Sequence, residues 1–165
     1  MDVSYQELDS PLGRLSLASA GGRLCALDFE EGRARIERRL ESRFGDVRLR
    51  PVRAAEGFSS RVRAYLDGDL DAIDDIPVDA GGTAFQQRVW AELRRIPRGE
   101  TRSYAQLAAI IGRRGSFRAV GSANASNPVA IVVPCHRVVG SDGSLTGYAG
   151  GVERKRFLLE HEGAL

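Results

Sequence analysis

The spacing of apolar residues changes along this chain, and the change limits the folds open to it. Residues 3–30 contain three short strand-like runs, YQELDS, RLSLAS and LCALDF, separated by Pro-Leu-Gly and Gly-Gly turns. These runs predict an antiparallel meander. The spacing then becomes helical, because apolar residues recur every four positions in residues 33–44 and a second amphipathic helix is predicted over residues 58–66. The pattern indicates an α/β (α+β) protein.

A domain boundary is predicted near residue 82. The acidic segment from Asp67 onward has little periodicity and ends at Gly81-Gly82, so residues 67–82 are expected to link domains of residues 1–82 and 83–165. The first half holds 12 Arg against 16 acidic residues, a net charge of −4, and the second holds 11 Arg and one Lys against 6, a net charge of +6. The second half is the candidate polyanion binder, although a solvated basic face would look the same.

Three helices are predicted in the second half. Thr83 is the expected cap of a helix whose apolar stripe covers residues 85–96, and Ser103 is the expected cap of a short helix over residues 104–111. A third helix is expected from about Ser116 to Ala125. Two short helices joined by a glycine-containing turn are typical of a helix-turn-helix, and also of many other small helical domains.

The two cysteines do not indicate a disulfide framework, because their surroundings differ. Cys25 lies in the strand-like run LCALDF and is predicted to be a buried, inert thiol. No run approaches the roughly 20 apolar residues of a membrane helix, and the N-terminus does not resemble a secretory signal. We therefore expect a cytoplasmic protein with reduced thiols and no contact with membranes.

The motif PCHRV contains the second cysteine and the residue types of nucleophilic chemistry. The preceding apolar run, Val129–Val133, is predicted to be a buried strand or extended segment, and Pro134 restricts φ at its exit, so that Cys135 is held at a defined place. The nucleophile is the thiolate, which His136, Arg137 or a helix N-terminus could stabilise. We expect Cys135 to avoid apolar burial and to have a low pKa. The alternative is a buried, inert thiol.

Five motifs resemble one known family in their order and spacing. They are GETRSYAQLA at 99–108, RAVGSANASNP at 118–128, PCHRV at 134–138, GYAGG at 147–151 and LLEHEG at 158–163. Together they resemble the active-site domain of the O6-alkylguanine-DNA alkyltransferase family, and the resemblance covers residues 83–165 almost without gaps. The opening segment SPLGRLSLA is similar to bacterial members but less specific.

The resemblance implies a fold and a reaction. The fold is an N-terminal ribonuclease-H-like domain with a small antiparallel sheet and a helical C-terminal domain with a helix-turn-helix. The reaction is the irreversible transfer of an alkyl (methyl) group from O6-alkylguanine in double-stranded DNA to a cysteine, once per protein molecule. The expected partner is double-stranded DNA, bound in its minor groove with low sequence specificity. The protein is expected to be a monomer and to flip the target base out of the duplex. O4-alkylthymine as a substrate and cooperative assembly on DNA stay open.

The resemblance also implies catalytic roles for individual residues. Cys135 would accept the alkyl group, and His136 would take its proton through a bound water. Glu162 would orient His136, and Asn127 would support the active-site turn. Tyr104 would donate a proton toward the departing guanine. No cofactor is implied, and no structural zinc is expected because the N-terminal domain has one cysteine and no histidine.

A second group of residues is implied to contact DNA. Arg118 would be the arginine finger that enters the base stack in place of the flipped guanine. The small residues Ala119, Gly121 and Ser122 would let their helix approach DNA closely. Phe117 is interpreted either as a wedge against the DNA backbone or, in preference, as a core contact.

The implied base pocket uses mainly backbone groups. The carbonyl of Val138 and the N–H of Ala149 would bind the guanine edge, Tyr148 would form a wall of the pocket, and Gly150 lies in the same loop. Many relatives have serine at the position of Ala149. Two other functions are weighed: a cysteine hydrolase, which would turn over repeatedly, and a non-catalytic sensor of alkyl lesions, whose known examples replace the acceptor cysteine.

Overall fold

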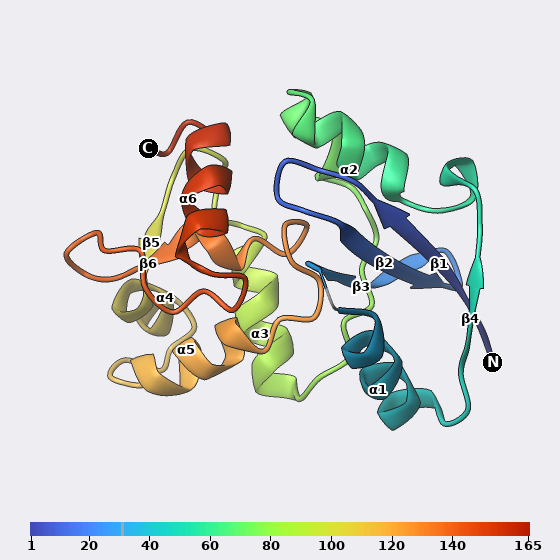
Figure 1. Ribbon diagram of the computed structural model, residues 1–165. Helices are drawn as coiled ribbons and strands as arrows, with labels where there is room; N and C mark the ends of the chain where they lie inside the picture. Colours follow the sequence, from blue (N-terminus) through green and yellow to red (C-terminus); the bar gives the residue numbers. More distant parts are fainter. Residues whose placement is uncertain (31) are drawn as a thin grey trace. The chain divides into compact units, whose positions relative to one another are not determined.

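The computed structural model describes residues 1–30 and 32–165, which form two units (Figure 1). Unit 1 comprises Met1–Gly81 together with Pro128–Val132, and unit 2 comprises Gly82–Asn127 together with Val133–Leu165. The boundary at residue 82 coincides with the Gly-Gly pair, but unit 1 also receives a short segment from the second half of the chain. Within residues 1–30 and 32–165, no helix is long and apolar enough to cross a membrane.

A four-stranded sheet forms the centre of unit 1, in the order β3-β2-β1-β4. The predicted meander is present as the antiparallel strands β1 (Asp2–Leu8), β2 (Leu15–Ala20) and β3 (Arg23–Asp28). Helix α1 (Gly32–Phe44), also predicted, packs Ile36 and Leu40 into a core cluster on this sheet. Strand β4 (Arg48–Pro51) was not predicted because its four residues are mostly exposed, and it pairs with β1 in parallel.

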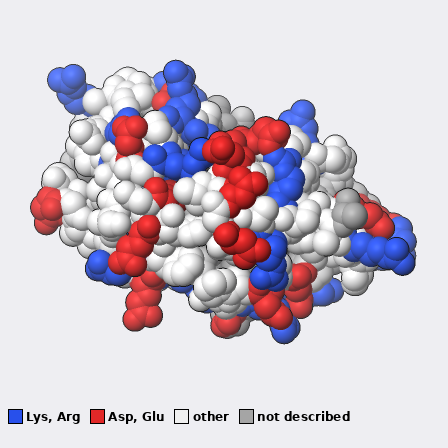
Figure 2. Space-filling model, turned by 90° about the horizontal axis from the view of Figure 1, so that it is seen from above, with Lys and Arg blue, Asp and Glu red and all other residues white. Residues whose placement is uncertain are grey.

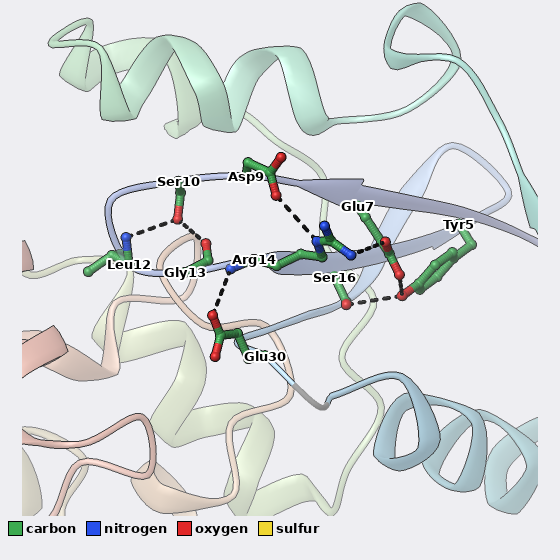
Figure 3. Close-up of polar contacts among 9 residues, drawn as sticks. All are labelled: Tyr5, Glu7, Asp9, Ser10, Leu12, Gly13, Arg14, Ser16 and Glu30. Carbon is green, nitrogen blue, oxygen red and sulfur yellow. Dashed lines mark hydrogen bonds and ion pairs between the residues drawn. The ribbon is translucent and has the colours of Figure 1, made fainter.

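The turn between β1 and β2 holds its shape through its own polar groups (Figure 3). The Ser10 hydroxyl accepts a hydrogen bond from the N–H of Leu12 and donates one to the carbonyl of Gly13. Gly13 has φ +92°, a conformation that favours glycine over any residue with a Cβ. The SPLG sequence therefore specifies this turn locally.

The predicted linker differs from the structure over most of its length. After the 3₁₀ turn η1 (Ala54–Glu56) and helix α2 (Ser59–Leu66), the chain forms a second 3₁₀ turn, η2 (Leu70–Ile73), and buries Ile73 and Ile76. It then runs along β3, where the N–H of Leu24 donates to the carbonyl of Pro77 over 2.8 Å. Isolated isoleucines among acidic residues have no periodicity, so the sequence pattern did not reveal that this segment packs into unit 1.

Unit 2 contains the three predicted helices and one more. Both capping residues are confirmed, because Thr83 forms a capping box with Gln86 and Ser103 forms one with Gln106. The elements are α3 (Ala84–Leu93), β5 (Arg102–Ser103), α4 (Tyr104–Ile110), α5 (Phe117–Ala125), η3 (Cys135–Arg137), β6 (Val138–Val139) and α6 (Val152–His161). Strands β5 and β6 pair in parallel, and α4 and α5 contact each other as two short consecutive helices (Figure 1).

The apolar run before Cys135 is buried as predicted, but it is hardly a strand. Val129 forms an isolated bridge with Leu27, and the N–H of Ala130 donates to the Leu27 carbonyl over 3.1 Å. Ile131 then turns the chain with φ +71°, the one positive value among the described non-glycine residues. A β-branched residue is strained in this conformation, by about 1–3 kcal/mol, and persists only where its surroundings hold it. Full burial of Ile131 supplies that restraint.

Candidate active site in unit 2

Two asparagines near the end of α5 hold the turn that carries Cys135. The side-chain amide of Asn127 donates to the carbonyl of Val133 over 2.8 Å, and that of Asn124 donates to the carbonyl of Cys135 over 3.2 Å. Their acceptors lie on either side of Pro134, which leads into η3. The cysteine is therefore fixed to the helix-turn-helix by side-chain hydrogen bonds as well as by the chain.

Cys135 is 7% exposed, so the prediction that it avoids burial is wrong. Burial raises the pKa of the Cys135 thiol, while a hydrogen bond with Asn127 and the positive charge of Lys155 act to lower it. The expected low pKa is thus also wrong for the free protein. The cysteine is a neutral thiol at neutral pH and needs a base to become a nucleophile.

His136 is placed as such a base should be, and it is neutral at neutral pH. Its side chain is fully buried, and its Nε2 atom lies 3.0 Å from Oε1 of Glu162. Burial lowers the pKa of His136, while the hydrogen bond with Glu162 and its negative charge act to raise it. A neutral imidazole that carries its proton on Nε2, the nitrogen that faces Glu162, presents Nδ1 as an acceptor. Within the described part of the chain, Nδ1 has no hydrogen-bond partner, so it is free to take a proton.

Glu162 is an ionised carboxylate held by two partners. Nε and Nη2 of Arg137 each donate to it over 2.9 Å, and Nη1 of Arg137 donates to the carbonyl of Ile96 over 2.6 Å. Burial alone would raise the pKa of Glu162, but hydrogen bonds from His136 and Arg137 hold it well below its usual range. Arg137 is therefore committed to Glu162, and the expectation that it acts on Cys135 is wrong.

The positive charge near Cys135 comes from Lys155, which sequence reasoning missed. Lys155 is fully buried in α6, and its Nζ donates to the carbonyl of Thr146 over 3.0 Å. Burial lowers the pKa of Lys155 to about 8, although a thiolate at Cys135 would raise it. A usable signal existed in the sequence, since Lys155 stands at helical spacing from Leu158, Leu159 and Glu162 and must share their buried face.

Tyr104 lies at the start of α4, half-buried, with its hydroxyl donating to the carbonyl of Thr146 over 3.3 Å. Glycines make room for it: a Cβ at Gly121 would lie 3.8 Å from the ring, and a Cβ at Gly147 would lie 3.1 Å from the hydroxyl oxygen. Burial raises the pKa of Tyr104, a thiolate at Cys135 would raise it further, and a hydrogen bond with Asn124 lowers it. Tyr104 is thus a neutral proton donor at neutral pH.

The residues of the predicted base pocket lie in two segments of unit 2. Val138 is buried in β6, where it pairs with Arg102 of β5. The loop before α6 contains the other three residues, of which Tyr148 is buried, Gly150 is half-buried and Ala149 is exposed. The loop also contains Thr146, so both the buried lysine and Tyr104 hydrogen-bond to this segment.

The outer face of α5 is exposed at its first turns. Arg118, Ala119 and Ser122 are exposed, and Phe117 is 51% exposed, so the preferred interpretation of Phe117 as a core contact is wrong. A large exposed aromatic residue beside an exposed arginine suits a binding surface better than a core. Gly121 differs from its neighbours, because it is half-buried beneath Tyr104.

A second group of polar residues lies in unit 1. A cavity of about 570 Å³ in unit 1 is lined by Glu7, Asp9, Ser10, Gly13, Arg14, Ser16, Glu30 and Arg33. Figure 3 shows the polar contacts of all these residues except Arg33. The three carboxylates of the cavity all accept from Arg14, whose side chain donates to Glu7 and Asp9 and whose backbone N–H donates to Glu30. On the face shown in Figure 2, acidic and basic side chains are interspersed. The described ranges contain no group of three or more His, Cys, Asp and Glu placed to hold a metal ion.

Comparison with known proteins gives the same family for both parts of the chain. Residues 3–80 match the model of the 6-O-methylguanine DNA methyltransferase, ribonuclease-like domain, and residues 84–164 match that of the 6-O-methylguanine DNA methyltransferase, DNA binding domain. Methylated-DNA–protein-cysteine methyltransferases from Salmonella typhimurium and Mycobacterium tuberculosis are 46% and 47% identical to this chain over 163 residues. These alignments cover 97% of this chain and 95% and 92% of those proteins.

Solved structures agree with the sequence relatives. A crystal structure of Mycobacterium tuberculosis OGT in complex with DNA is 44% identical, with a TM-score of 0.82, covering 98% of this chain and 93% of that one. The O6-methylguanine-DNA methyltransferase of Pyrococcus kodakaraensis is 31% identical, with a TM-score of 0.74 and coverage of 98% and 99%. The predicted fold class is confirmed. The chain therefore belongs to the family of 6-O-methylguanine DNA methyltransferases, the methylated-DNA–protein-cysteine methyltransferases.

Proposed function

We propose that this protein repairs alkylated DNA by moving an alkyl group, typically methyl, from O6 of guanine to Sγ of its own Cys135. One observation carries the proposal: a buried thiol precedes a buried, neutral His136, whose far nitrogen is held by an ionised Glu162. This is the order of nucleophile, base and orienting carboxylate found in covalent catalysis. The relatives named above for the same activity support it.

The reaction balances with the groups present. The Cys135 proton passes through a water molecule to Nδ1 of His136, and Glu162 stabilises the resulting imidazolium. The thiolate forms a bond to the alkyl carbon, the bond from that carbon to O6 breaks, and its electron pair stays on the guanine. Tyr104 then donates its proton to a ring nitrogen of the departing base. The thioether has no good leaving group, so each protein molecule reacts once.

We propose that α4 and α5 bind the minor groove of duplex DNA. Their contacts are mainly to the sugar-phosphate backbone of the DNA, so the sequence specificity is low. The exposed Arg118 would fill the space that the flipped-out guanine leaves in the base stack. Its neighbours on α5 would contact the DNA around it: Phe117, Ala119, Gly121 and Ser122. Backbone groups of Val138 and Ala149, with Tyr148 and Gly150, would receive the base. This chemistry needs neither a cofactor nor a metal, and we propose that the protein acts as a monomer in the cytoplasm.

The test is to mix the protein with a duplex that carries one O6-methylguanine and to map the methyl group by peptide mass spectrometry. We expect one methyl per active protein, on Cys135, in a single burst without a steady state. Sustained turnover on esters or amides would favour the cysteine hydrolase. Tight binding of the lesion without transfer would favour the non-catalytic sensor.

Arg118→Ala is expected to slow repair of duplex DNA far more than reaction with free O6-benzylguanine. The arginine stabilises only the extruded state of the base, and a free base needs no extrusion. The measurement is the ratio of the two single-turnover rates in the variant and the wild type. Equal reductions of the rate on the two substrates would show that Arg118 does not stabilise the extruded base.

A further inference from the structure

Phe117 is an exposed aromatic residue at a position where the helix pattern favours a buried one. It is the first residue of α5, whose buried residues are Val120, Ala123 and Asn124. The helix is regular from its first turn, since the N–H of Val120 donates to the carbonyl of Ser116 over 3.1 Å. Phe117 precedes Val120 by three residues and shares its side of the helix, yet Val120 is fully buried and Phe117 is 51% exposed. The buried face of α5 thus continues into an aromatic side chain that is half open to solvent.

The side of α5 that carries Phe117 leads to the proposed active site. Gly121 lies four residues further on, about 40° around the helix axis from Phe117 and about 6 Å along it. A Cβ at Gly121 would lie 3.8 Å from the ring of Tyr104. One turn later, the side chain of Asn124 donates to the carbonyl of Cys135 over 3.2 Å. Phe117 therefore lies on the same side of α5 as the proposed proton donor and the nucleophile.

The surface around Phe117 favours a polyanion as its partner. The sequence contains no Asp or Glu from position 101 to position 141, and Arg113, Arg114 and Arg118 are all exposed. The guanidinium of Arg113 lies over the ring of Phe85, 5.2 Å from its centroid, so its cation–π partner is a different ring. An apolar ring among arginines and without carboxylates suits an unstacked nucleobase, because the ring can stack on the base while the arginines bind phosphates.

We propose that Phe117 stacks on one of the two bases that flank the alkylated guanine in its own strand, while Arg118 fills the space left by the guanine. The proposal rests on the alkyl transfer and base flipping proposed above. The strand that delivers the guanine has to pass the side of α5 nearest Tyr104. Phe117 lies on that side, and Arg118 projects about 100° away from it. Extrusion removes a stacking partner from the flanking base, and the ring of Phe117 takes its place.

This stacking makes Phe117 a specificity-determining residue. A purine has a larger ring face than a pyrimidine and loses more stacking when the guanine leaves. The contribution of the ring to extrusion is therefore larger beside a purine, and it disappears where the flanking nucleotide has no base. A contact between Phe117 and the sugar-phosphate backbone would be independent of the flanking base.

The test compares Phe117→Ala with wild type in single-turnover methyl transfer from duplexes that differ only in the nucleotides flanking O6-methylguanine. With purines on both sides, the variant is expected to react roughly 5- to 100-fold more slowly, as for the loss of one stacked base. With pyrimidines the reduction is expected to be smaller, and with an abasic nucleotide on the stacked side it is expected to fall below about twofold. Reaction with free O6-benzylguanine is expected to stay near the wild-type rate, since a free base has no neighbour.

Phe44→Ala is the matched control, because Phe44 is also an exposed phenylalanine but is the last residue of α1 in unit 1. It is expected to react at the wild-type rate on every duplex. A wild-type rate in Phe117→Ala, or a reduction that is equal beside purine, pyrimidine and abasic nucleotides, would overturn the proposal. A reduction that disappears only when the nucleotide opposite the lesion is abasic would overturn it too, because the ring would then stack in the complementary strand.

Two further outcomes have defined meanings. If the alanine variant does not fold, Phe117→Leu, which keeps an apolar side chain without an aromatic face, takes its place in the same comparison. Failure of the wild type to transfer methyl from any of the duplexes would instead reject the proposed function.

Discussion

Cys135→Ser is expected to abolish methyl transfer, and Cys25→Ser is expected to leave the rate unchanged. A serine hydroxyl has a far higher pKa than a thiol, so a neutral imidazole such as His136 cannot ionise it. Even the native thiol has its pKa raised by burial and depends on that base. Cys25 is 3% exposed in β3, and burial raises the pKa of its thiol. The residue directly after it is Ala26, which cannot act as a base.

The two substitutions form a matched pair, because both remove one buried thiol and add one hydroxyl. The measurement is the burst of methyl transfer from labelled duplex DNA, together with DNA affinity, which is expected to persist in both variants. Transfer retained in Cys135→Ser would contradict the mechanism. Transfer lost in Cys25→Ser, with the fold intact, would show that the acceptor had been assigned to the wrong cysteine.

Arg137→Met is expected to destabilise the protein by about 3–5 kcal/mol, the usual cost of breaking a buried ion pair by removing one partner. Arg137 is 6% exposed and supplies two of the hydrogen bonds that hold the Glu162 carboxylate. For a chain of this length, such a loss lowers the Tm by about 10 °C. Arg95→Ala is the control, because its ion pair with Glu92 is largely exposed and contributes about 1 kcal/mol or less.

The pH dependence of this loss has a defined sign. The pKa of Glu162 is held below its ordinary value of 4.5, so the ionised carboxylate contributes stability above pH 4.5, which is lost as the pH falls through the folded pKa. The gap in unfolding free energy between wild type and Arg137→Met is therefore largest near neutral pH and narrows in acid. Chemical unfolding at several pH values measures it. A difference in unfolding free energy that does not change with pH would show that Arg137 does not stabilise the protein through the charge of Glu162.

Much of the fold follows from local patterns in the sequence. The four-residue spacing of Ile36 and Leu40 specifies one face of α1, and the hydroxyls of Thr83 and Ser103 specify where α3 and α4 begin. The family motifs identified Cys135 as the candidate nucleophile. These signals work because each depends on residues within a few positions of one another.

The environment of Cys135 could not be read in the same way. Its polar neighbours His136 and Arg137 suggested exposure and a low pKa, yet both side chains turn to Glu162, a partner 25 residues beyond Arg137. The compensating charge, Lys155, comes from α6, which was not predicted as a helix. Long-range pairing of buried charges therefore sets the chemistry of this site, and adjacency along the chain does not reveal it.

The excursion of residues 128–132 into unit 1 means that the chain cannot be divided cleanly at the Gly-Gly pair. A fragment that begins at Gly82 would retain the proposed catalytic groups but would lack the β3 edge that receives Val129 and Ala130. Its strained Ile131 would lose the packing that holds it, and a short apolar stretch beside the nucleophile would meet water. The first half of the chain thus supplies the packing for a segment of the second half, so that cutting the chain at the Gly-Gly pair divides one folded core.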